Sequence, residues 1–108
     1  MRKITQETVN AFFSGGDLAK NSMVVANARA YFHGNLISRI IDGNKLQISF
    51  CGWVTHTTCE RINGIVSTAT KGKIEVGIKN GEPELRHANG DKEIIDSCDW
   101  YTIDTLKY

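Results

Sequence analysis

The sequence predicts a single α+β domain over residues 1–108, with two helices and an antiparallel sheet of hairpins in the order α-βββ-α-ββββ. Three observations support this fold class. Apolar residues recur at helical spacing in two segments, and they alternate with polar residues in most of the remaining chain. Short turn signals such as Asp42-Gly43-Asn44 and Asn80-Gly81 separate the alternating segments, and such short connections are typical of antiparallel strands.

The first helix is predicted over residues 4–14. Thr5 is the expected N-cap, because its hydroxyl can accept a hydrogen bond from an otherwise unpaired N–H of the first turn. Gly15-Gly16 ends the segment, since glycine readily adopts the left-handed conformation that terminates helices. The apolar stripe of this helix comprises Val9, Phe12 and Phe13.

The segment from residue 22 to residue 50 is predicted to form strands. Its β-prone runs lie at residues 23–25, 30–32, 36–41 and 45–50. In the last run Leu46, Ile48 and Phe50 fall on one face and polar residues on the other. This alternation indicates a sheet with one buried face and one face in contact with water.

The second helix is predicted over residues 55–69. Thr57 and Glu60 have the spacing of a capping box, and Thr55 is the competing N-cap. Ile62, Ile65 and Val66 form its apolar stripe, whereas Arg61 and Asn63 are expected on its polar side.

The remaining strands are predicted near residues 74–79, 84–87, 93–95 and 100–103, with Asn89-Gly90 as a further turn. The residues expected to be buried are Phe12, Phe13, Ile48, Phe50, Ile62, Ile65, Val76 and Ile78.

Composition excludes several classes of protein. The chain has 13 Lys and Arg against 12 Asp and Glu, and 41% of its residues are hydrophobic. These values exclude an intrinsically disordered chain, a polycation and an acidic mimic of DNA.

Charge is unevenly distributed along the chain. Residues 1–80 hold ten basic and five acidic residues, and residues 81–108 hold three basic and seven acidic residues. We expect folding to interleave these charges, with a basic N-terminal body as the alternative.

Cysteine and histidine usage argues against a metal site, a cofactor or a disulfide framework. Cys51, Cys59 and Cys98 are odd in number and none forms a C-x-x-C pair, so we expect reduced thiols. Cys51, His56 and Cys59 lack the fourth ligand of a structural zinc site. A cysteine nucleophile with a histidine base remains an alternative. No apolar run reaches membrane-spanning length, and we expect neither secretion nor a membrane partner.

Two segments carry a resemblance to a known group of proteins. They are His33-Gly34-Asn35-Leu36-Ile37 and residues 52–64, GWVTHTTCERING. Together they resemble small bacteriophage proteins with an H-G-N-x-I-A element followed by G-W-x-T-x-T-T-x-x-R-L-N-G. The chain departs from this pattern at Ser38, where alanine is usual, and at Ile62, where leucine is usual. The resemblance implies a phage origin and expression in the bacterial host cytoplasm, and it transfers no catalytic residues.

From these observations we expect a phage accessory protein that is not an enzyme. Its predicted action is stoichiometric binding to a host bacterial protein, as an inhibitor of host defence of the anti-CRISPR type. A nucleic-acid-binding regulator that uses the basic N-terminal body is the first alternative, and a small Cys/His enzyme is the second. The sequence does not decide whether the protein forms a homodimer. The predicted partner-binding residues are Tyr31, Arg39, Trp53, Arg61 and Trp100, because aromatic and arginine side chains near turns are frequent interface anchors.

Overall fold

The computed structural model describes residues 2–108 and confirms the α+β class. Helix α1 spans Lys3–Ser14, α2 spans His56–Ala69, and a short 3-10 helix, η1, covers Thr105–Lys107. The strands are β1 (Leu18–Lys20), β2 (Met23–Ala26), β3 (Arg29–Phe32), β4 (Asn35–Asp42), β5 (Lys45–Ile48), β6 (Ile74–Lys79), β7 (Glu82–His87), β8 (Lys92–Ile94) and β9 (Tyr101–Asp104). All strand pairs are antiparallel.

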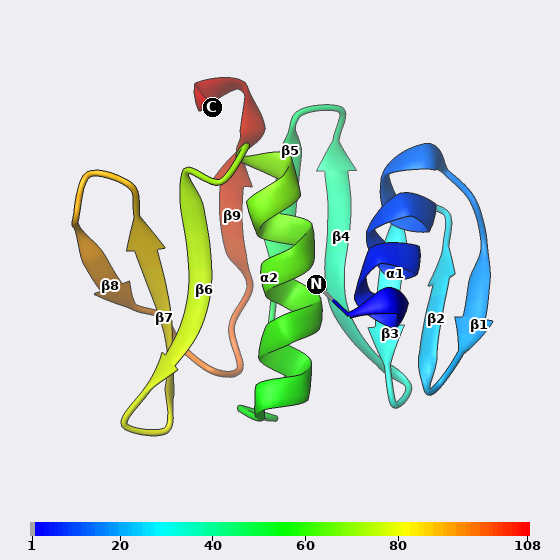
Figure 1. Ribbon diagram of the computed structural model, residues 1–108, viewed down its shortest axis with the longest axis horizontal. Helices are drawn as coiled ribbons and strands as arrows, with labels where there is room; N and C mark the ends of the chain where they lie inside the picture. The colour runs from blue at the N-terminus through cyan, green and yellow to red at the C-terminus, as the bar shows by residue number, and fades with distance from the viewer. Residues whose placement is uncertain (1) are drawn as a thin grey trace.

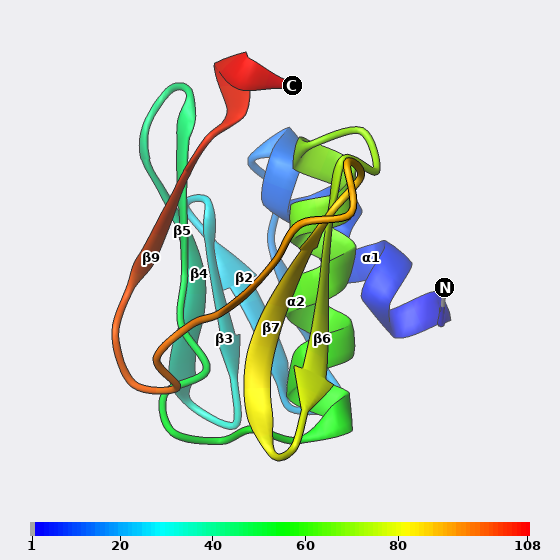
Figure 2. The same ribbon diagram turned by 90° about the vertical axis from the view of Figure 1, so that its left-hand side faces the viewer.

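The strands form two sheets in place of one. The six-stranded sheet has the order β1-β2-β3-β4-β5-β9, and the three-stranded sheet has the order β6-β7-β8. In Figure 1, α2 lies between the small sheet and α1. Figure 2 shows these three units as one layer against a single face of the six-stranded sheet. The core lies between the two layers, and within the described residues no element covers the opposite face of the large sheet.

The predicted N-cap residue of the first helix, Thr5, is wrong. Arg2 is the N-cap residue and offers no side-chain hydrogen bond. Thr5 lies one turn inside the helix, fully buried, and its hydroxyl donates to Glu60 Oε1 of α2 at 2.9 Å. The Thr5 hydroxyl therefore connects α1 to α2 and does not cap α1. The predicted stop is confirmed, because Gly15 caps α1 at a φ of 75°.

Local turn chemistry is confirmed elsewhere in the chain. Thr55, the competing cap, begins α2, with its hydroxyl accepting from the Thr58 N–H at 3.2 Å. The predicted Thr57–Glu60 capping box is wrong, because the Glu60 carboxylate binds Thr5 and Arg61. Asn80 and Gly81 connect β6 to β7 with φ angles of 52° and 79°, the left-handed pair that a tight hairpin requires. Strand β1 was absent from the sequence prediction, because its three residues form only a short edge strand on β2.

Six of the eight residues predicted for the core are buried, and two are not. Phe13 is 40% exposed, and Ile78 is partly exposed. Phe13 is next to Phe12 in α1 and therefore points about 100° away from it around the helix. Phe12 points into the core, whereas Phe13 is 40% exposed and packs edge to face against the Phe12 ring.

Candidate functional site

A pocket lies between the turn that joins β3 to β4 and the beginning of α2, and both of these segments are at the lower end of the molecule in Figure 1. We call it the motif pocket. Its volume is about 480 Å³, within the range of small-molecule sites. The two segments that carry the phage resemblance supply seven of its nine lining residues. The lining comprises Phe32, His33, Asn35, Ile37, Phe50, Trp53, Thr55, Thr57 and Thr58.

A tight turn positions the first wall of the motif pocket. His33 and Gly34 have φ angles of 50° and 80°, so the chain reverses over these two residues between β3 and β4. The His33 ring packs against the Phe32 ring with 4.2 Å between centroids. Beyond the turn, an irregular register between β3 and β4 leaves Ile37 without a partner on β3, and its side chain is buried on the pocket side. The wall therefore combines aromatic and aliphatic surface.

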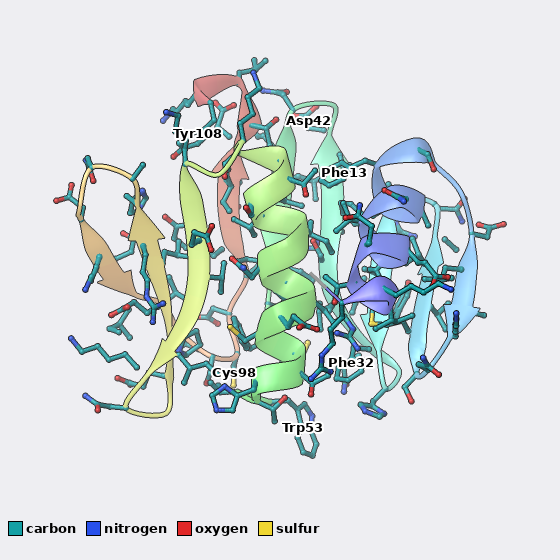
Figure 3. The ribbon with its side chains drawn as sticks, in the orientation of Figure 1. Phe13, Phe32, Asp42, Trp53, Cys98 and Tyr108 are labelled. Carbon is teal, nitrogen blue, oxygen red and sulfur yellow. The ribbon has the colours of Figure 1, made fainter. Side chains whose placement is uncertain are left out.

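A second turn presents Trp53 at the mouth. Cys51 and Gly52 both have positive φ angles, and the Trp53 N–H donates to the Phe50 carbonyl at 2.8 Å. The Gly52 N–H donates to the Ser97 carbonyl at 2.7 Å, which fixes this turn to the segment before β9. The Trp53 side chain is nevertheless 62% exposed, and Figure 3 shows its indole projecting past the ribbon near Phe32. The predicted anchor Trp53 is therefore available to a ligand.

Polar groups surround the apolar interior of the motif pocket. The hydroxyls of Thr55 and Thr58 are hydrogen-bonded to each other at 3.0 Å. Within residues 2–108, the Asn35 amide and the Thr57 hydroxyl have no side-chain hydrogen-bond partner. No acidic residue is among the nine that line the pocket. The pocket thus offers apolar and aromatic surface with a few free, uncharged polar groups at its rim.

Arg61 lies behind this pocket and is not on the polar side of α2, so that sequence expectation is wrong. Its side chain is 4% exposed. One guanidinium nitrogen, Nη1, donates to the Thr5 hydroxyl at 2.8 Å and forms an ion pair with Glu60, which Arg2 also contacts at 3.3 Å. Arg61 therefore joins α1 to α2 and cannot contact a partner without rearrangement.

Asn63 and Cys59 also have structural roles on α2. The Asn63 amide oxygen accepts from the Val76 N–H at 2.7 Å, and the Cys59 thiol donates to the Val76 carbonyl at 3.4 Å. These side chains bond to the edge of β6 that has no neighbouring strand, and α2 covers that edge. Burial raises the pKa of the Cys59 thiol, which disfavours the thiolate that a cysteine nucleophile needs.

Three of the predicted anchors lie together on the uncovered face of the large sheet, which we call the open face. Tyr31 is on β3, Arg39 is on β4, and Trp100 immediately precedes β9. Val24 pairs with Tyr31 and is 45% exposed, and Arg29 pairs with Arg39 across the β3–β4 ladder. The preceding residues Ala30 and Ser38 are buried beneath the sheet, so Tyr31 and Arg39 point to the opposite face.

The centre of the open face is held by side-chain contacts. The Arg39 guanidinium lies 4.1 Å from the centroid of the Trp100 ring, and its Nε donates to Gln47 Oε1 at 2.8 Å. Gln47 in turn donates to the Thr102 hydroxyl at 3.0 Å. This row crosses β4, β5 and β9 and fixes the Arg39 side chain in one orientation.

The charges of the two chain halves are partly interleaved. Strand β6 brings Lys79 of the first block next to Glu82 of the second, and within the second block Arg86 donates to the buried Glu84 carboxylate at 2.8 Å. The Arg86 hydrogen bond is the main reason that the pKa of Glu84 lies below its usual value. The basic and acidic blocks of the sequence therefore do not form two separate surfaces over β6 and β7.

Residues 2–108 contain neither a metal-ligand cluster nor a membrane-spanning helix. No group of three or more His, Cys, Asp and Glu side chains lies close enough to hold a metal ion. In the same range, neither helix is long and apolar enough to cross a membrane.

Comparison with protein families matches residues 1–107 to the family described as Kyanoviridae Gp96 protein. The chain belongs to this family. Membership of the Gp96 family supports the phage origin that the sequence indicated, and the match includes both segments that line the motif pocket. No curated protein and no solved structure matches this Gp96 chain.

Sequence reasoning did not predict that the motif pocket and the open face of the Gp96 chain would form, although it found several of their residues. Arg29 and Asn35 were not among the predicted binding residues. Asn35 stood in a quoted segment, but only the fold brings it close to the start of α2. Arg29 gave no local signal, because its importance comes from its register with Arg39 on the next strand.

Proposed function

We propose that this Gp96-family chain is a phage accessory protein that binds a host protein stoichiometrically and acts without catalysis. The observation that supports the proposal is the gathering of Tyr31, Arg39 and Trp100 on the open face. Tryptophan, tyrosine and arginine are the residues most enriched among interface hot spots. A sheet face that no other element covers is an accessible place for them.

Charge on the open face supports a partner with an acidic surface. Arg29 and Arg39 are direct cross-strand neighbours, an arrangement that destabilises a sheet when nothing neutralises it. Within residues 2–108 neither forms a salt bridge to an acidic side chain. A carboxylate of a partner would relieve this repulsion, and guanidinium groups bind carboxylates with two parallel hydrogen bonds.

The more specific part of the proposal is that the partner belongs to a host defence system, such as a CRISPR complex, in the bacterial cytoplasm. Its support is the phage family together with a preorganised binding face on a chain of 108 residues. A protein of this size can occlude about 800 Å² of a partner, the area of a typical specific interface. Occlusion of a nuclease or of its target-binding surface inhibits without any chemistry.

The test is capture of a host protein followed by quantitative binding with purified components. Tagged chain is incubated with host lysate, and a retained protein is then purified and titrated in calorimetry. We expect a 1:1 complex whose dissociation constant rises at least tenfold in Trp100→Ala and in Arg39→Glu. Leu106→Ala is the matched control, because Leu106 is 79% exposed at the far C-terminal end. Equal affinity in all three variants, or no retained protein, would contradict the proposal.

A second candidate is binding of single-stranded nucleic acid on the same face. Arginines interspersed with exposed aromatic rings on a sheet are a common platform for unstacked bases. The salt dependence separates the two candidates. Nucleic acid binding loses affinity steeply with salt in proportion to the phosphates neutralised, whereas a protein complex persists at moderate salt. Light scattering in the same experiments shows whether the chain is a homodimer.

A further inference from the structure

The motif pocket lies at the end of the large sheet and contains none of the open-face residues Tyr31, Arg39 and Trp100. We propose that it is a second binding site, and that its ligand is a nucleobase, adenine in preference, carried by a free nucleotide or by a nucleic acid strand. This inference does not rest on the proposed host-protein complex.

The shape and surface of the pocket fit a flat aromatic ring. The Trp53 indole stands at the mouth, and the Phe32 and His33 rings, tilted by 52° to each other, also line the pocket. Phe50 is fully buried and contributes to the interior. Stacking on aromatic side chains is the general way in which proteins hold unpaired bases.

The polar rim favours a base over a purely hydrocarbon group. The Asn35 amide presents a donor and an acceptor side by side, and it is free of other side-chain partners in the described residues. An asparagine amide matches the N6 and N7 edge of adenine with two hydrogen bonds. Thr57 adds a hydroxyl that can donate or accept. A hydrocarbon ligand would leave both groups without partners, which costs free energy when water is excluded.

The surroundings suit the phosphate that accompanies a base. Thr55, Thr57 and Thr58 belong to the cap and first turn of the 14-residue helix α2, where the helix dipole is positive. Behind the Phe32 wall, the Arg61 guanidinium lies 5.9 Å from the ring centroid, and its buried Nε has no hydrogen-bond partner. Arg2 and Arg61 share the single carboxylate of Glu60, so this cluster carries a net positive charge. The potential near the pocket therefore favours an anion.

Fluorescence gives a direct test, because the chain contains only two tryptophans. In a Trp100→Phe background, Trp53 is the only indole and reports stacking by quenching. The titrants are AMP, UMP, ribose 5-phosphate and a single-stranded oligonucleotide of ten deoxyadenosines. We expect saturable quenching by AMP or by the oligonucleotide, weaker quenching by UMP, and none by ribose 5-phosphate. Tighter, salt-dependent binding of the oligonucleotide identifies a strand as the source, and equal affinities identify a free nucleotide.

Two variants of the pocket and one control complete the test. Asn35→Asp keeps the shape of the side chain but removes its N–H donors, and we expect at least tenfold weaker binding of AMP. Trp53→Ala, measured by calorimetry, should weaken binding to a similar degree, and its exposed position leaves the fold intact. Leu106→Ala is the matched control and should bind normally, because Leu106 is 79% exposed and lies outside the pocket. The inference is overturned if no base-bearing probe binds, if both pocket variants bind normally, or if Leu106→Ala weakens binding as much as they do.

Discussion

Replacement of Arg61 tests whether this residue is structural, as the fold indicates, or a partner contact, as the sequence predicted. Arg61 is 4% exposed and connects α2 to α1 through Thr5 and Glu60. Arg61→Ala removes the guanidinium and leaves a space between the helices. Arg61→Met removes the charge but retains a long side chain that fills the same space. The pair of variants therefore separates the contribution of charge from that of packing.

The expected magnitudes follow from the surroundings of Arg61. Loss of one member of a buried ion pair costs about 3–5 kcal/mol, mostly because the other charge is left uncompensated. Glu60 is 33% exposed and retains Arg2 at 3.3 Å, so we place Arg61→Ala at the lower end, about 3 kcal/mol. Arg61→Met takes the same charge away from Glu60 but fills the space between the helices, so it should be less destabilised than Arg61→Ala by about 1 kcal/mol. Arg61→Glu adds a second carboxylate beside Glu60 and should unfold the domain.

Urea unfolding followed by circular dichroism measures these differences. For a domain of about 100 residues, a loss of 3 kcal/mol lowers the melting temperature by about 12 to 24 °C. The reasoning is refuted if Arg61→Met is as destabilised as Arg61→Ala, which would mean that filling the space between the helices contributes nothing. It is also refuted if Arg61→Ala unfolds like the unmodified chain, which would mean that the side chain is free. A host-protein complex weakened by Arg61→Glu would then reflect binding and not folding.

Three further predictions address the core, the thiols and the response to pH. Phe50→Ala and Val76→Ala each remove part of a buried side chain, and Phe50→Ala, the larger truncation, should cost about 3–5 kcal/mol. If neither variant changed the melting temperature, these two side chains would not be buried in the core as described. With a thiol reagent at neutral pH, exposed Cys98 should react quickly and Cys59 only on unfolding, because burial raises the pKa of Cys59. Stoichiometric zinc lost in Cys59→Ser would contradict the expectation of metal-free thiols. Burial and the hydrogen bond to Glu93 raise the pKa of Tyr101 to about 12. Its contribution to stability is therefore complete below the ordinary value of 10.0 and is lost as the pH rises from there toward 12, which absorbance of the tyrosinate and unfolding at matched pH can follow.

Sequence patterns were sufficient where the determining interaction is local. The alternation in residues 45–50 predicted the buried face of β5, because side chains in a strand point to opposite sides at every step. Gly15 and the Asn80-Gly81 pair were found because the left-handed backbone conformation favours these residue types wherever the chain lies. The phage origin followed from two short segments, and the family match supports it.

Only the tertiary structure decided the interactions between distant segments. Thr5 has the chemistry of an N-cap, yet α2 places Glu60 within 2.9 Å of its hydroxyl and gives it a different partner. Arg61 is charged, and charged residues are usually exposed, but the packing of α1 against α2 buries it with its counterion. The motif pocket combines segments about twenty residues apart, and the open face combines three strands through their register. The local sequence pattern determined which residues form each helix and strand. The packing of these elements determined which side chains meet, because the burial of a side chain and its bonding partners depend on contacts between segments that are distant in the sequence.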